Sequence, residues 1–331
     1  MLIEAGGKDA DREARGWIRG AVFERRKMLA VSTSWRSEIS DDGLEVIQAI
    51  LDLGVGGVEL EYRITPSMVK EILPLLKKER ICVTSLHNFF PLPEGLPKEK
   101  AGGDVFSLSA PDGEERALAV KYTLRTMEWA EELGARAVVL HLGKIPMDDP
   151  MEDLKKLYDQ KKIQTEEGRI FIEAQRKVRA RNSLKHLDAA LRSLEKLALE
   201  ADRRRISLGL ENRFNLQDFP DLDEFKKIFK EFSGGPVLYW HDLGHATVQQ
   251  NLGLADSKEF LENFSELLVG VHLHGCRGYD DHYAPGSGGE DYSLLQNFLR
   301  PDTLLVVETH HRASREEMLQ GLEFLRGRRI S

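Results

Sequence analysis

Three apolar runs decide the fold of this chain: ISLGLE at residues 206–211, VLYWHD at 237–242 and VGVHLH at 269–274. Each is mostly apolar without strict two-residue alternation, which is typical of a strand covered on both faces in a parallel sheet. Each also ends on an acidic residue or a histidine. Outward from these three, the pattern recurs in five further runs: Met28–Ser34, Gly57–Glu61, Ile81–Leu86, Ala137–His141 and Leu304–Glu308. The sequence therefore predicts eight buried strands.

Segments of helical length separate these strands. Their apolar residues recur three and four positions apart, as in Leu187-Leu191-Leu194-Leu197. Several end at a glycine, as Leu53-Gly54 does, which is typical of a helix C-terminus. Eight β-then-α units favour an α/β fold of the (β/α)8 TIM-barrel class, because right-handed crossovers close such a set without an open edge. The alternative, a doubly wound open sheet, usually has a glycine-rich phosphate loop after its first strand, and this chain has Ser-Thr-Ser-Trp there.

Three stretches lie outside the minimal barrel unit. Residues 1–27 are highly charged and are predicted to form an N-terminal extension, which leaves 28–331 as a single barrel domain. Residues 88–112 are rich in proline and glycine and form a long loop after the third strand. Residues 144–180 are highly charged and predict a helical insertion after the fourth. Both insertions follow strands, so we expect them at the C-terminal face of the barrel, where barrel enzymes have their active sites.

Composition excludes several classes of protein. The 331 residues are 41% hydrophobic and 31% charged, as in an ordinary globular protein. A net charge of -8 repels polyanions and argues against nucleic acid as a partner. No apolar run approaches the roughly 20 residues that span a bilayer, so no membrane partner is expected. The two cysteines, Cys82 and Cys276, are too few for a disulfide framework and predict a reducing compartment, the cytoplasm.

The histidines concentrate at one level of the predicted barrel. Eight of the ten lie at or just beyond strand C-termini: His87, His141, His241, His245, His272, His274, His310 and His311. Acidic residues end three strands at the same level, namely Glu211, Asp242 and Glu308. Barrel closure brings these ends to one pocket, where a buried carboxylate without a partner would be costly. Any one of these histidines could simply be a hydrogen-bonded residue of the barrel mouth. The histidines and carboxylates taken together indicate a divalent metal site for Zn²⁺, Mn²⁺, Co²⁺, Fe²⁺ or Mg²⁺.

Five motifs at these strand ends occur in order along the chain: Leu210-Glu211-Asn212, His241-Asp242-Leu243-Gly244-His245, Val271-His272-Leu273-His274, Asp281-His282-Tyr283-Ala284-Pro285-Gly286-Ser287-Gly288 and Val307-Glu308. Together they resemble the motifs of the xylose-isomerase-like TIM-barrel superfamily, and the likeness runs from about Leu29 to Leu325. That superfamily contains sugar and sugar-phosphate isomerases and epimerases, and also zinc-dependent apurinic/apyrimidinic endonucleases.

The resemblance implies a metal-dependent isomerase or epimerase that acts on a sugar or sugar phosphate. It implies that Glu211, Asp242, His272 and Glu308 bind the principal metal. It also implies that Glu211 and Glu308 transfer protons on opposite faces of a metal-stabilised enediolate. Three carboxylates and one imidazole leave coordination positions open for substrate oxygens. His274 is the second choice for the imidazole ligand, because it lies two residues after His272 on the same strand face.

Further residues are candidates for binding a small-molecule sugar or polyol. The resemblance implies that His245 binds a substrate hydroxyl. Arg213 and Arg277 are candidates for a sugar hydroxyl, carboxylate or phosphate, since a guanidinium binds such groups through two parallel hydrogen bonds. Trp35, after the first strand, is a candidate wall for the sugar ring. The sequence leaves open a homo-oligomer.

Two other functions remain at this point. The zinc endonucleases of the superfamily hold three metals, and the chain has candidates for the additional ligands in His87, His141, His245 and Asp280-x-His282. A metal cluster suits phosphodiester cleavage, but the acidic net charge weighs against it. The third possibility is a catalytically silent barrel that binds a metal or a sugar, because a fold does not dictate a function.

Overall fold

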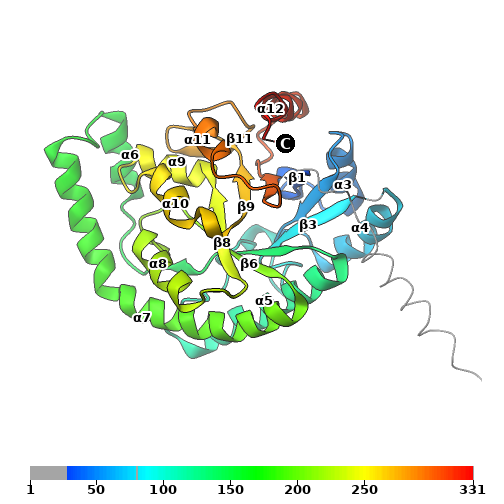
Figure 1. Cartoon of the computed structure of the whole chain (residues 1–331), viewed down its shortest axis with the longest axis horizontal. Helices are drawn as coiled ribbons and strands as arrows, with labels where there is room; N and C mark the ends of the chain where they lie inside the picture. Colours follow the sequence, from blue (N-terminus) through cyan, green and yellow to red (C-terminus); the bar gives the residue numbers. More distant parts are fainter. Residues whose placement is uncertain (1–27, 80, 331) are drawn as a thin grey trace, which may run out of the picture.

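The computed structural model describes residues 28–79 and 81–330, and its centre is a closed barrel of eight parallel strands (Figure 1). In chain order the strands are β1 (Leu29–Ser32), β2 (Gly57–Leu60), β3 (Cys82–His87), β4 (Ala137–Leu140), β6 (Ser207–Glu211), β8 (Val237–Asp242), β9 (Leu268–Leu273) and β12 (Leu304–Val307). Each pairs with its neighbours, and β12 pairs with β1 to close the barrel. The predicted TIM-barrel class and all eight predicted strands are confirmed, with small differences at the strand ends.

Helices cover the outside of the barrel. They are α2 (Ser34–Ser37), α3 (Gly43–Leu51), α4 (Pro66–Glu79), α5 (Gly113–Leu133), α6 (Met151–Asp159), α7 (Glu166–Arg204), α8 (Leu222–Glu231), α9 (Leu243–Asn251), α10 (Ser257–Phe264), α11 (Tyr292–Gln296) and α12 (Arg315–Gly327). No helix in these described residues is long and apolar enough to cross a membrane. The largest buried apolar cluster lies between these helices and the outward face of the strands.

The barrel interior has a small core of its own, centred on Trp240. Trp240 is fully buried, and its ring centroid lies 5.0 Å from that of His272. Gly270 leaves room for the indole, because a Cβ at that position would lie 2.2 Å from Trp240 Cζ3. The Trp240 indole therefore closes the barrel interior beneath the side chains at its C-terminal mouth.

The predicted helical insertion after the fourth strand is confirmed. It consists of α6 and the first part of α7, a 39-residue helix that continues without a break into the crossover to β6. Figure 1 shows α7 running past the side of the barrel toward the segment around α6. The 88–112 loop contains only the short 3-10 helix Lys98–Lys100. The predicted extension 1–27 lies outside the described residues.

Two short antiparallel pairs decorate the C-terminal face. One joins β5 (Gly143–Lys144) to β7 (Asp218–Phe219), and the other is the hairpin of β10 (Gly275–Arg277) and β11 (Asp280–Tyr283). The hairpin follows β9 directly, so it brings the Asp-His motif of the sequence back over the end of the barrel.

Candidate metal centre

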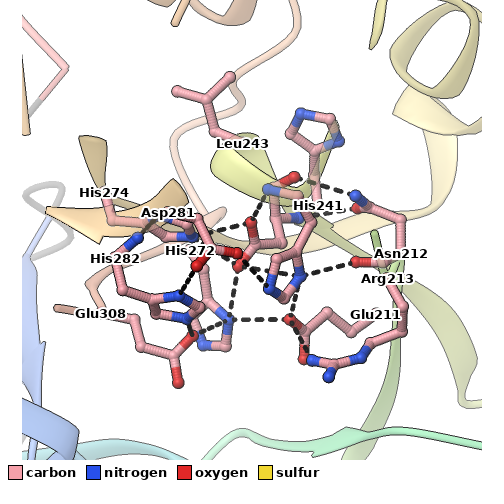
Figure 2. Close-up of polar contacts among 12 residues, drawn as sticks. Glu211, Asn212, Arg213, His241, Leu243, His272, His274, Asp281, His282 and Glu308 are labelled. Carbon is pink, nitrogen blue, oxygen red and sulfur yellow. Dashed lines mark hydrogen bonds and ion pairs between the residues drawn. The ribbon is translucent and has the colours of Figure 1, made fainter. Parts of the chain in front are cut away.

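The ends of β6, β8, β9 and β12 bring Glu211, Asp242, His272 and Glu308 together. Their candidate ligand atoms all lie within 4.8 Å of one another, and all four side chains are buried. His272 Nδ1 lies 2.9 Å from Glu308 Oε2, 3.6 Å from Glu211 Oε1 and 3.6 Å from Asp242 Oδ2 (Figure 2). The four residues expected to hold the principal metal thus face one point, and we call them the principal group.

The other nitrogen of His272 has a fixed partner. Its Nε2 lies 3.2 Å from Glu59 Oε1, and Ser85 Oγ donates to Glu59 Oε2 at 2.7 Å. Because an ionised carboxylate only accepts hydrogen bonds, neutral His272 has its proton on Nε2 and a free lone pair on Nδ1. Glu59 was not among the candidate ligands. The signal in the sequence is a carboxylate inside the otherwise apolar run Gly57–Leu60.

Buried polar atoms without partners test whether these residues fit a metal. Among the described residues, His272 Nδ1 and Glu211 Oε1 are both buried and form no hydrogen bond of good geometry; their nearest polar neighbours are Glu308 Oε2 at 2.9 Å and His245 Nδ1 at 3.2 Å. Such orphaned atoms are rare in folded proteins, since each costs free energy unless something binds it. Once His272 gives up its Nδ1 proton, the lone pair of Nδ1 and Glu211 Oε1 face each other among the neighbouring carboxylates, and this arrangement fits a divalent cation.

A second group of candidate ligands, which we call the outer group, comprises His87, His141 and Glu211. His87 Nδ1 lies 3.1 Å from the Asn88 carbonyl, which can only accept, so the lone pair of neutral His87 is on Nε2. That Nε2 lies 3.2 Å from Glu211 Oε2. The Nε2 of His141 lies 2.9 Å from the same oxygen. The outer group therefore shares Glu211 with the principal group.

A third group comprises Asp242, His245, His274 and His282. His245 Nε2 is buried and has no hydrogen-bond partner among the described residues. His274 differs, because its Nδ1 accepts the backbone N–H of His282 at 2.9 Å. The proton of neutral His274 is therefore on Nε2, 2.9 Å from Asp242 Oδ1. His274 orients Asp242 by donating to it, and this geometry does not favour the ligand role that the sequence gave it as second choice.

Gly244 leaves the space that His274 occupies. A Cβ at Gly244 would lie 1.9 Å from His274 Cε1, so Gly244→Ala must displace the imidazole from Asp242. We expect this variant to bind Mn²⁺ about 10- to 100-fold more weakly, the usual effect of losing a residue that orients a ligand. Isothermal titration calorimetry measures the affinity. Unchanged affinity in a folded Gly244→Ala variant would contradict the orienting role of His274.

The hairpin places Asp281 near the third group instead of Asp280. Asp281 Oδ2 lies 3.5 Å from His245 Nε2, and Asp281 Oδ1 lies 2.8 Å from His282 Nδ1, whereas Asp280 is exposed. The cause is the backbone of His282, whose φ of 58° lies in the left-handed region and breaks the strand alternation. The structure therefore places Asp281 beside His245 and His282, at the position predicted for Asp280.

Two of the predicted substrate-binding residues have other roles. Trp35 is fully buried in the outer core, and its indole N–H donates to the Ala313 carbonyl at 2.7 Å. Arg277 is exposed, stacks over Tyr283 and donates to the Ser287 carbonyl. Neither side chain faces the principal group. Arg213 does approach it, at 3.8 Å from Glu211 Oε1.

The remaining strand-end histidines do not join the ligand groups. His241 Nδ1 lies 2.7 Å from the Tyr239 hydroxyl, and Tyr239 packs against Phe225 in the core outside the barrel. His310 stacks on His282 with ring centroids 4.0 Å apart. His311 is exposed and forms an ion pair with Glu38.

Asn212 connects the strand ends behind the principal group. Its Oδ1 accepts from the Asp242 backbone N–H and from the Tyr239 hydroxyl, each at 2.8 Å. Its Nδ2 donates to the Asp242 carbonyl at 2.9 Å. The Glu-Asn motif therefore supplies both a ligand candidate, Glu211, and an amide that fixes the backbone of Asp242.

The carboxylates and imidazoles shift the pKa values of one another. Burial lowers the pKa of His282, but Asp281 and Glu308 outweigh it and raise that pKa to about 10. Burial also lowers the pKa of His272, and Glu308 and Glu59 raise it well above its usual value. Without a metal, His282 is therefore protonated at neutral pH, and the neighbouring carboxylates favour the protonated form of His272.

This protonation predicts how metal binding depends on pH. A metal that uses His272 must displace its proton, so we expect Mn²⁺ affinity to rise with pH across the neutral range. Protons should be released as each ion binds. Calorimetry in buffers of different ionisation enthalpy counts them. An affinity that does not change with pH, together with no proton release, would contradict the described geometry.

The comparisons with known proteins agree with this architecture. The family model described as "Xylose isomerase-like TIM barrel" matches residues 47–328. A D-tagatose 3-epimerase-like protein is similar in structure, with a TM-score of 0.65, 18% identity, and coverage of 91% of this chain and 96% of that one. The 3-keto-D-glucoside 4-epimerase from E. coli has a TM-score of 0.64, 18% identity, and coverage of 91% and 100%.

A third similar structure is the IOLI protein with a bound zinc atom, with a TM-score of 0.61 and 14% identity. The matched region covers 90% of this chain and 95% of the IOLI chain. No curated protein matches this sequence.

Proposed function

Since this chain belongs to the xylose isomerase-like TIM-barrel family, we propose that it is a divalent-metal-dependent sugar isomerase or epimerase. The reaction is proton transfer next to a carbonyl, through an enediolate. The observation that supports the proposal most is the convergence of Glu211, Asp242, His272 and Glu308 on one point. The names of similar structures, D-tagatose 3-epimerase-like protein, D-psicose 3-epimerase and L-ribulose 3-epimerase, support a ketose as substrate.

The principal group would hold the metal, and two of its carboxylates, Glu211 and Glu308, would transfer the substrate proton. A bound divalent ion supplies Lewis acidity, which makes the hydrogen next to a sugar carbonyl acidic enough to be abstracted. Glu211 ends β6 and Glu308 follows β12, two strands that are not neighbours in the barrel. Their carboxylates therefore reach the group from different sides, so one can remove a proton and the other can return it on the opposite face.

The composition of the group favours particular metals. Three carboxylates and one imidazole form an oxygen-rich set of ligands, and such a set suits Mn²⁺. Zn²⁺, Co²⁺, Fe²⁺ and Mg²⁺ are further candidates. We also propose a cytoplasmic location, because Cys82 and Cys276 are both free, as expected in a reducing compartment.

Solvent exchange tests the proposed reaction. The protein, reconstituted with Mn²⁺, is incubated in D₂O with D-tagatose, D-psicose and L-ribulose, and with the phosphate of each ketose, in separate reactions. We expect deuterium on the carbon next to the carbonyl of at least one ketose, detected by proton NMR. Absence of exchange from all three ketoses, and from their phosphates, would contradict the proposed function and favour a silent binding barrel.

A second candidate function, phosphodiester cleavage by a metal cluster, is supported by one observation. The outer and third groups adjoin the principal group through Glu211 and Asp242, which is how a cluster of ions would share carboxylates. The net charge of -8 weighs against a DNA substrate. A duplex with an abasic site should therefore be neither bound nor cut at moderate salt. Efficient cleavage would establish this second function instead.

A further inference from the structure

The Arg213 guanidinium lies beside two members of the outer group, His141 and Glu211. Its Nη1 lies 2.8 Å from His141 Nε2 and 3.8 Å from Glu211 Oε1, and its Nη2 lies 3.7 Å from Asp104 Oδ2. Only 15% of its side chain is exposed. Figure 2 shows the guanidinium beside the Glu211 carboxylate.

The chemistry of the guanidinium favours one tautomer of His141. His141 Nε2 lies 2.8 Å from Arg213 Nη1 and 2.9 Å from Glu211 Oε2. Because a guanidinium has donors only, the contact with Arg213 is a hydrogen bond when Nε2 holds a lone pair. The proton of His141 is then on Nδ1, which lies 3.4 Å from Asp104 Oδ2. This is the tautomer of a metal-binding histidine with a carboxylate behind it.

The same tautomer leaves two acceptors facing each other. In neutral His141 with this tautomer, Nε2 and Glu211 Oε2 are both acceptors, and they lie 2.9 Å apart. Two acceptors at this distance repel unless a cation lies beside them, and in a metal site the ion has that role. Here the Arg213 guanidinium lies beside both.

The charge of Arg213 is permanent. An arginine side chain stays protonated at any pH at which the protein is folded. A metal entering between His141 and Glu211 would have to displace a buried cation from two carboxylates and would meet its repulsion.

We propose that Arg213 is a resident cation that takes the place of a metal in the outer group, so that His87, His141 and Glu211 bind no ion in the native protein. This inference rests on the proposed function, because it assigns to the principal group the metal used for sugar chemistry. It also gives a physical reason why the ligand set of the outer group can be present without an ion of its own. Arg213 is thus a determinant of metal number.

Metal stoichiometry tests the proposal. Metal-free protein is saturated with Mn²⁺, freed of excess ion by gel filtration and analysed by inductively coupled plasma mass spectrometry. We expect Arg213→Ala to bind one equivalent more than the native protein. Arg204→Ala is the matched control, since Arg204 is also 15% exposed and lies between Glu128 and Glu131 on the outer helices. The control should leave the number of bound ions unchanged.

A second substitution locates the additional ion. His141→Leu removes a ligand of the outer group, so the Arg213→Ala/His141→Leu double variant should return to the native number. His141→Leu alone should also retain the native number, and this result does not depend on Arg213→Ala folding. The proposal is overturned if His141→Leu alone loses an equivalent, or if folded Arg213→Ala gains none.

The stoichiometry is measured without substrate, so it is independent of the sugar reaction. If the native protein catalyses no deuterium exchange but all variants bind the expected number of ions, the proposed function is overturned and the role of Arg213 stands. If the native protein catalyses exchange but the variants bind other numbers of ions, the role of Arg213 is overturned and the proposed function stands.

Discussion

Glu308→Gln is expected to slow solvent deuterium exchange into the ketose substrate by about 100- to 10,000-fold, the usual contribution of a general acid or base. Glu308 is buried, and its Oε2 lies 2.9 Å from His272 Nδ1 at the centre of the principal group. The amide of glutamine keeps the shape of the side chain but cannot take up a proton. Proton NMR in D₂O measures the exchange rate.

Two controls make this result specific. Glu71→Gln changes a carboxylate on the outer helices that accepts the Gly43 backbone N–H, and it should leave the exchange rate unchanged. Metal content is measured alongside, because Glu308 is also a candidate ligand. If Glu308→Gln retained full exchange, Glu308 would have no acid or base role. If the variant retained its metal and lost exchange, proton transfer would be its role.

His272→Gln should weaken Mn²⁺ binding by at least about 100-fold, since even residues that only orient a ligand usually contribute 10- to 100-fold. His272 is the single imidazole of the principal group, and the other three members lie around its Nδ1. Losing it leaves three neighbouring carboxylates without the nitrogen that faces all of them. The same variant should show no deuterium exchange at Mn²⁺ concentrations that saturate the native protein.

His186→Gln provides the matched control. His186 is buried like His272, but it lies on α7 and belongs to none of the three groups. We expect the native Mn²⁺ affinity for His186→Gln. An equal loss of affinity in both variants would mean that the effect of His272→Gln is a general loss of stability. Native affinity in His272→Gln would exclude His272 as a ligand.

The fold could be predicted from sequence because its pattern is repeated and local. Each barrel strand is a short apolar run, and each run alternates with a segment of helical periodicity, so one ambiguous strand does not change the fold class. The convergence of Glu211, Asp242, His272 and Glu308 follows from the same logic. Residues at the C-terminal ends of parallel strands meet at the mouth of a closed barrel, wherever they lie along the chain.

The rest of the site depends on conformations that strand positions do not determine. Asp281 rather than Asp280 faces the third group because one residue, His282, has a left-handed backbone. Arg277 stacks on Tyr283 because the β10–β11 hairpin turns its side chain to the surface. His274 has a lone pair on the wrong nitrogen for a ligand because a backbone N–H eight residues later occupies Nδ1. These are details of loops and hydrogen-bond partners, and periodicity contains no information about them.

Crystals grown with Mn²⁺ test the central claim most directly, through an anomalous difference map at the mouth of the barrel. The account predicts a strong peak within bonding distance of Glu211, Asp242, His272 Nδ1 and Glu308 together. The account would be contradicted if Mn²⁺-saturated crystals gave no anomalous peak at that point, or if the ion that gave the peak were bound by other residues.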